Sequence, residues 1–335
     1  MITAHLFLAD AASEKGPDVN YCNFPCRISH MHTICKLKHR CEASLRCKRF
    51  KNLPFSNKEK QKIMHTHNSF RNRIALGRGC KSMEGRWFPA AASMRELVWD
   101  RELEFQAQCW ANQCIMKHDT CRRKYDGQYA GQILASVRHE SIFPALRLFF
   151  NECKNTSVAN IDWYGTGKEW GSHFAQMVYW NTTQIGCARV IYELALPSSR
   201  RVTFVCNYAW AGNWVGEPIY IRGSPASQCP AHSKPHRELK GLCTTNPSKS
   251  KIPNICKFAK DKKKCIPYLA MVKRVRFHRD RQEGKRYILN EHNELRNKVA
   301  LGQLGNTRII CPQASNMREI IWDEELEFFA QCWIN

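Results

Sequence analysis

The chain has 335 residues, of which 43% are hydrophobic and 18 are cysteines, and its formal net charge is +23. That length and apolar content exclude a disordered polypeptide and allow one large core or two smaller ones. No segment stays apolar over the roughly 20 residues that a membrane-spanning helix needs. No cysteine pair has the Cys-x-x-Cys spacing of zinc ribbons, so the cysteines predict a disulfide framework and a secreted, extracellular protein.

The N-terminus holds a short apolar run without the basic start of a complete signal peptide. We expect residues 1–19 to be the remnant of such a signal or to be disordered. Residues 20–230 are expected to form one complete domain with a Cys-rich N-terminal extension.

Four helices are expected in this domain. Ser56 and Glu59 form a capping box that begins the first helix, and Gly77 ends it. Asp100 caps the second helix. The third is expected over residues 143–152 and the fourth over residues 172–179.

Two strands are expected, over residues 185–193 and 202–207, because both segments are rich in β-formers and bounded by turn residues. Helices and strands that do not alternate as βαβ units predict an α+β domain or a layered αβα arrangement.

A basic linker is expected over residues 231–285, since residues 231–290 hold 17 Lys and Arg against 4 Asp and Glu. Its two dense basic points, where basic residues are most closely spaced, are Lys262-Lys-Lys264 and Lys273-Arg-Val-Arg276. Either this charge is simply solvated, or it attaches the protein to sulfated glycans or anionic surfaces. No nucleic-acid partner is expected, because a disulfide-rich secreted chain seldom meets one.

The chain repeats itself near its C-terminus. The segment His67–Gly77 recurs as His292–Gly302, and Met94–Phe105 recurs as Met317–Phe328. We therefore expect residues 286–335 to be the N-terminal fragment of a second domain, with two helices, and the chain to be incomplete there.

Four polar residues of the first unit are candidates for one site: His118, Gln132, Glu152 and His173. Two imidazoles and a carboxylate suit a divalent cation, with zinc as the first choice. The alternative is that these histidines are structural, because 55 residues separate His118 from His173.

Further motifs lie in the segments Tyr21–Cys26, Trp110–Arg122, Ser172–Val178 and Val205–Tyr208. Together with the His67 helix, they resemble insect venom antigen 5 proteins. These belong to the CAP superfamily of cysteine-rich secretory, antigen 5 and pathogenesis-related 1 proteins. The resemblance covers residues 20–229 and, as an incomplete copy, residues 288–335. It implies a three-layer αβα sandwich with a central cleft.

Carried over by position, the cleft residues that the resemblance implies are His118, Gln132, Glu152 and His173. Many relatives have a glutamate at the position of Gln132, and an amide is a poorer ligand for a cation than a carboxylate. We therefore expect weak metal binding by His118, Glu152 and His173. The sequons at Asn155 and Asn181 are candidates for glycosylation.

The same resemblance implies several disulfides. They are Cys22–Cys35, Cys26–Cys121, Cys187–Cys206, and a bridge from Cys114 to either Cys41 or Cys47. Cys109–Cys153 is an additional expectation. Cys80 and Cys229 are left without an expected partner.

As to function, the resemblance implies a secreted, non-enzymatic protein of venom or saliva. It would bind small ligands, such as a sterol or fatty acid and a divalent cation, or host proteins and glycans, with no cofactor required. The alternative is a hydrolase in which Glu152 and a histidine activate water, with or without zinc. The sequence has neither a nucleophile elbow nor a His-Glu-x-x-His motif, which favours a binding protein.

Overall fold

A computed structural model describes residues 17–24, 26, 31–165, 172–193 and 200–259, together with 293, 305–306 and 309–310. The chain divides into two units, Met1–Val272 and Lys273–Asn335. Residues 1–16, the two dense basic points and most of the expected second copy lie outside the described residues. Within the second unit, strands β6 (Gly305–Asn306) and β7 (Ile309–Ile310) pair antiparallel.

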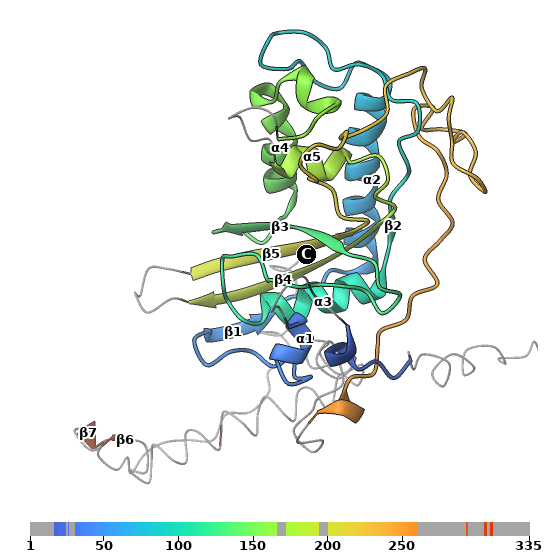
Figure 1. The fold of residues 1–335 in the computed structure, drawn as a ribbon. Helices are drawn as coiled ribbons and strands as arrows, with labels where there is room; N and C mark the ends of the chain where they lie inside the picture. Colours follow the sequence, from blue (N-terminus) through green and yellow to red (C-terminus); the bar gives the residue numbers. More distant parts are fainter. Residues whose placement is uncertain are drawn as a thin grey trace, which may run out of the picture. The chain divides into compact units, whose positions relative to one another are not determined.

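The first unit is built around one sheet (Figure 1). Its strands run in the order β1-β4-β5-β3, and β2 pairs in parallel with β4. Their bounds are β1 Lys48–Asn52, β2 Val98–Trp99, β3 Ala130–Val137, β4 Gln184–Glu193 and β5 Arg200–Ala209. The two strands expected from the sequence correspond to β4 and β5. The sheet's other strands were not expected, although β3 pairs with β5 along its full length.

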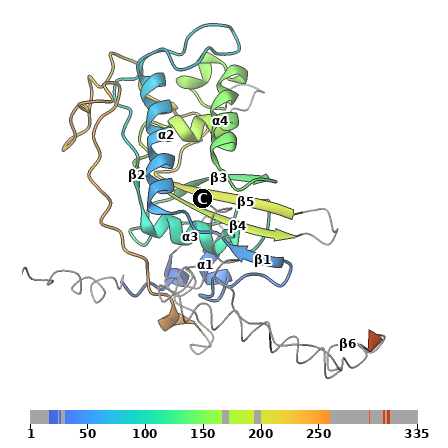
Figure 2. The same ribbon diagram turned by 180° about the vertical axis from the view of Figure 1, so that it is seen from behind.

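Helices cover both faces of the sheet (Figures 1 and 2). On one side lie α2 (Asn57–Ala75), α4 (Phe143–Asn151) and α5 (Ser172–Val178), and on the other lie α1 (Thr33–Lys36) and α3 (Arg101–Ala111). The first unit is thus an α+β domain with three αβα layers, as the resemblance implies.

The expected helix caps are present. The Glu59 amide donates to Ser56 Oγ at 3.2 Å, and the Ser56 amide donates back to Glu59 Oε2 at 2.8 Å. Asp100 Oδ1 accepts from the Leu103 amide at 2.8 Å. These bonds satisfy amides at the helix N-termini that have no partner within the helix.

The main core lies between the sheet and the α2–α4–α5 layer. It includes the fully buried residues Ile63, Ile74, Leu146, Phe174 and Val202. On the other face, the absence of a side chain at Gly186 lets β4 and α3 approach closely. A Cβ there would collide with the main chain of Leu103 and Glu104.

Arg71 of α2 is a fully buried cation whose described acceptors are main-chain carbonyls. They belong to Arg95, Met177, Tyr179, Trp180 and Thr182. Burial lowers the pKa of Arg71 to about 9. Through these bonds α2 fixes the end of α5 and the turn that leads to β4.

Residues 231–259, the first half of the expected linker, pack on the domain (Figure 1). Leu242 is fully buried in the main core, and the Cys243 amide donates to the Met94 carbonyl at 2.8 Å. Further along, Ile255 joins a small cluster with Tyr21 and Ile34 of the N-terminal extension. This part of the basic segment therefore contributes to the packing of the domain.

Seven disulfides connect described residues. They are Cys22–Cys35, Cys26–Cys121, Cys41–Cys109, Cys47–Cys114, Cys80–Cys153, Cys187–Cys206 and Cys229–Cys243. Of the two alternatives for Cys114, the structure has the bridge to Cys47. The expected Cys109–Cys153 bridge is wrong, because Cys109 is bonded to Cys41 and Cys153 is bonded to Cys80.

Candidate functional site

His118 lies in the segment that joins α3 to β3, and Gln132 lies on β3. Disulfides at Cys114 and Cys121 hold this segment on both sides of the histidine. His118 Nδ1 and Gln132 Oε1 are 3.0 Å apart. The structure thus brings these two expected site residues into direct contact.

The neighbours of Gln132 fix the orientation of its amide. Gln132 Nε2 donates to Asp119 Oδ1 at 2.9 Å and to Asn207 Oδ1 at 3.1 Å. A carboxylate at Asp119 only accepts, so the NH₂ group must face it and the carbonyl oxygen must face His118. His118 therefore donates from Nδ1, and in the neutral ring Nε2 keeps its lone pair.

Burial lowers the pKa of His118 and the positive charge of Arg122 lowers it further, while the Gln132 bond and Asp119 oppose this. The neutral imidazole is therefore favoured near neutral pH. A neutral imidazole with an open Nε2 is the form that accepts a proton or binds a metal ion.

Glu152 and His173 form a second pair. His173 Nδ1 donates to Glu152 Oε1 at 2.6 Å, and the His173 amide donates to Glu152 Oε2 at 3.0 Å. Glu152 directly follows α4 and His173 is the second residue of α5, so this pair also joins the two helices. The imidazole stacks on Phe149, with ring centroids 4.1 Å apart. These contacts orient the ring and leave its Nε2 directed away from the carboxylate.

A cleft of about 340 Å³ contains His118 and Gln132 in its lining. Tyr129, Gln176 and Trp214 contribute to the same lining, and the Glu152–His173 pair lies outside it. The structure thus arranges the four expected cavity residues as two hydrogen-bonded pairs, of which one lines this cleft.

Among the described residues, no three His, Cys, Asp or Glu side chains gather closely enough to hold a metal ion. The expected three-ligand set of His118, Glu152 and His173 is therefore not assembled. Both Glu152 oxygens accept hydrogen bonds from the protein. Gln132 and Glu152 each orient one imidazole ring through its Nδ1 atom.

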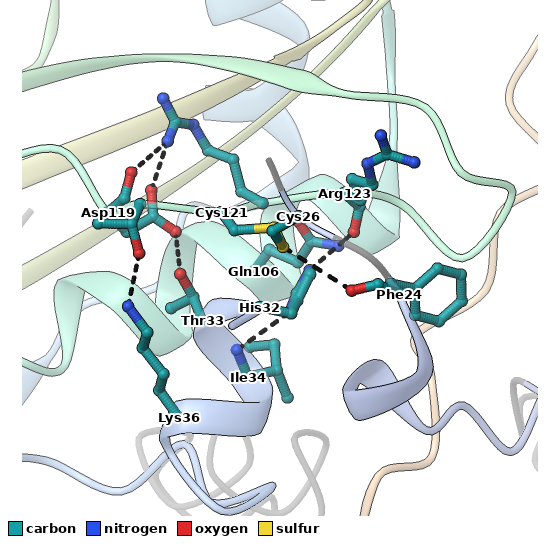
Figure 3. The surroundings of a disulfide bond; sticks show 12 residues. Phe24, Cys26, His32, Thr33, Ile34, Lys36, Gln106, Asp119, Cys121 and Arg123 are labelled. Carbon is teal, nitrogen blue, oxygen red and sulfur yellow. Dashed lines mark hydrogen bonds and ion pairs between the residues drawn. A yellow bond between two sulfur atoms is a disulfide. The ribbon is translucent and has the colours of Figure 1, made fainter. Parts of the chain in front are cut away.

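Sequence reasoning missed Asp119, which connects the cleft to the N-terminal extension (Figure 3). Its Oδ2 accepts from Thr33 Oγ1 at 2.5 Å, and its Oδ1 accepts from Arg122 at 2.8 Å as well as from Gln132. Its position directly after His118 was the available signal. The extension therefore supports the residue that orients Gln132.

The Cys26–Cys121 disulfide lies beside this contact (Figure 3). Next to it, His32 Nδ1 accepts from the Ile34 amide at 3.1 Å, so Nε2 carries the proton and donates to the Arg123 carbonyl at 2.9 Å. Burial lowers the pKa of His32 to about 4. The extension is thus held by a neutral histidine and a disulfide.

A separate groove of about 660 Å³ lies beside α2 and α4. Phe70 and Phe150 stack in it at 4.1 Å, and Trp87, which is 53% exposed, completes its aromatic lining. Four cations also line the groove, and its lining has no carboxylate. These cations are Arg73, Lys81, Arg147 and Lys154.

The two glycosylation candidates differ in surroundings. Asn155 is exposed at the end of a short 3₁₀ helix, Glu152–Asn155, and the sequon hydroxyl of Ser157 donates to Glu84 at 2.5 Å. Asn181 is only partly exposed, in the turn before β4, and the next residue, Thr182, is fully buried. Asn155 is therefore the more accessible acceptor.

The chain belongs to the cysteine-rich secretory protein (CAP) family, whose family model matches residues 64–208. Venom allergen 5 of the wasp Polistes dominula is 34% identical over 215 residues, covering 61% of this chain and 90% of its relative. Venom allergen 3 of the ant Solenopsis invicta is 32% identical over 231 residues, covering 66% of this chain and 97% of that relative. The insect relatives thus align with most of their own length.

Two solved structures are similar to part of the chain. Na-ASP-1 has a TM-score of 0.48 and 24% identity, covering 60% of this chain and 50% of that chain. NaASP2 with Zn²⁺ has a TM-score of 0.46 and 28% identity, covering 57% and 97%.

None of the described helices combines the length and apolar character needed to cross a lipid bilayer.

Proposed function

We propose that this protein is a secreted, non-enzymatic CAP protein that binds amphiphilic small ligands. Secretion is supported by the seven disulfides that connect described residues and by the venom allergen names of its relatives. The observation that carries ligand binding is the groove beside α2 and α4. Its aromatic lining suits an apolar chain, and its cations suit an acidic head group.

A fatty acid fits this lining better than a sterol does. Arg73 lies 5.9 Å from the Phe150 ring and Lys81 lies 5.4 Å from the Trp87 ring, so charge and apolar surface adjoin. A neutral sterol would leave these cations without a counter-charge, whereas a carboxylate at the end of an alkyl chain would pair with them.

Calorimetric titration with palmitate, its neutral alcohol and cholesterol tests this proposal. Arg147→Gln/Lys154→Gln protein should bind palmitate roughly five- to tenfold more weakly, with the affinity for the alcohol unchanged. Lys58→Gln/Lys240→Gln is the matched control, because both lysines are exposed and outside the groove lining. Equal palmitate affinity in all variants, or tight binding of cholesterol alone, would contradict the fatty-acid proposal.

We further propose that the two oriented imidazoles bind a divalent cation weakly. Support comes from the hydrogen bonds that leave Nε2 of His118 and of His173 available. When bound, zinc would supply a positive charge beside the two imidazoles. Zinc titration should release heat with wild-type protein and lose that heat with His118→Ala/His173→Ala. Unchanged heat in this variant would exclude the two imidazoles as ligands.

A hydrolase is the alternative function. It would need an activated water near Glu152 or a histidine, together with a substrate pocket. Glu152 hydrogen-bonds His173 and lies outside the cleft lining, which favours binding over hydrolysis. Turnover of an ester or peptide substrate that disappears in Glu152→Gln protein would favour the enzyme instead.

A further inference from the structure

The turn between α1 and β1 displays an apolar side chain to solvent. Leu45 is 94% exposed, the highest value among the exposed large apolar residues that the structure describes. The Ser44 amide donates to the Asn112 carbonyl at 2.9 Å, and the Cys47 amide donates to the Ser44 carbonyl at 2.9 Å. These bonds close a tight turn with Leu45 at its tip.

Two disulfides hold this turn in place. Cys41 is bonded to Cys109 of α3, and Cys47 is bonded to Cys114 just beyond α3. The turn therefore cannot easily fold back to bury Leu45. Transfer of an exposed leucine out of water lowers the free energy, so a turn held in this way presents Leu45 for contact with an apolar phase.

Cations surround the turn in the sequence. Four cationic side chains at the turn and on β1 are exposed: Arg46, Lys48, Arg49 and Lys51. The nearby carboxylates are those of Glu42 and Glu193, so cations outnumber anions here. Of the cations, Arg49 lies 3.3 Å from Glu193. Lysines on an edge strand such as β1 also hinder pairing with other chains. That explanation covers the lysines of the strand, but it does not explain an exposed leucine at the adjacent turn.

We propose that residues 42–51, the Leu45 turn, dock on the surface of an anionic lipid bilayer. Leu45 enters the boundary between head groups and acyl chains, and the flanking cations pair with anionic head groups. One apolar anchor and a few cations give reversible attachment, because each signal alone is weak. A sulfated glycan would use the cations but not the leucine, so Leu45 distinguishes the two partners.

Co-sedimentation with vesicles tests the proposal directly. Wild-type protein should bind phosphatidylcholine vesicles containing phosphatidylserine at least tenfold more tightly than pure phosphatidylcholine vesicles. Leu45→Asn should weaken binding to the anionic vesicles roughly tenfold, as loss of one inserted leucine requires. Leu148→Asn is the matched control, since Leu148 is 68% exposed on α4, far from the turn in sequence and in the opposite helical layer.

The charge is tested separately. Arg46→Gln/Lys48→Gln should weaken binding to anionic vesicles by roughly fivefold for each cation removed, and added salt should reduce the difference. Lys58→Gln/Lys240→Gln should bind as the wild type does. An unchanged thermal midpoint verifies that each variant is folded. The proposal is overturned if Leu45→Asn binds like the wild type, if Leu148→Asn loses as much, or if heparin but not vesicles binds the turn.

Discussion

At the scale of single residues, the structure explains why an amide suits position 132. Its NH₂ group donates to Asp119 and its carbonyl accepts from His118, so one side chain links an acid to a base. A glutamate there would place a second carboxylate beside Asp119 and would lack the donor. The amide of Gln132, which in the sequence suggests a lost metal ligand, therefore supplies the donor that the neighbouring Asp119 carboxylate needs.

Gln132→Glu is accordingly expected to destabilise the domain at neutral pH by about 2–3 kcal/mol, because two buried acceptors lose their donor and two carboxylates approach each other. Chemical denaturation at pH 7 measures this loss. The loss should be smaller at pH 4, where one proton can be shared between the carboxyls. If Gln132→Glu has the same free energy of unfolding as the wild type at pH 7, the hydrogen bond from Gln132 to Asp119 does not contribute to stability.

At the scale of elements, the N-terminal extension is attached to α3 through a buried carboxyl. Tyr21 Oη donates to Glu102 Oε1 at 2.7 Å, and the Tyr125 amide donates to the same oxygen at 2.6 Å. Burial, with a further contribution from the negative charge of Asp100, raises the pKa of Glu102 to about 8. The extension thus rests on a carboxyl that stays protonated at neutral pH.

This raised pKa predicts the sign of a pH dependence. Unfolded, Glu102 releases its proton near 4.5, whereas in the folded domain it holds the proton up to about 8. The stabilisation is fully present below pH 4.5 and falls as the pH rises towards 8, by about 1.4 kcal/mol per pH unit at most. Glu102→Gln should flatten the change in unfolding free energy measured between pH 5 and pH 8.5. An equally steep dependence in this variant would contradict the assignment.

Sequence patterns predicted the helices better than the strands. Ser56 and Asp100 indicate helix starts because a capping side chain bonds to an amide only a few residues further along the chain, so the signal can be read from neighbouring residues. Strand β3 was missed because the segment Ala-Gly-Gln-Ile-Leu-Ala-Ser-Val is largely buried and does not alternate. Its strand character comes from pairing with β5, some 70 residues later.

At the scale of the whole molecule, distant segments cooperate in ways that no local pattern reveals. Leu242 lies in a basic, polar segment that its composition predicts to be a linker. In the structure, however, Leu242 is fully buried in the main core. The candidate site behaves similarly. Resemblance pointed to His118 and His173, but the role of Asp119 depends on contacts with Thr33 and Gln132 that only the folded chain creates.

The two disulfides that flank His118 have a practical consequence. Cys114 and Cys121 both lead back to the extension, to Cys47 and Cys26, so the cleft histidine is positioned by bonds that exist only after oxidation. Protein made in a reducing cytosol would contain the same site residues but would lack the two disulfides that hold the His118 segment in position. Material for any binding experiment therefore needs to pass through an oxidising secretory pathway or an oxidative refolding step.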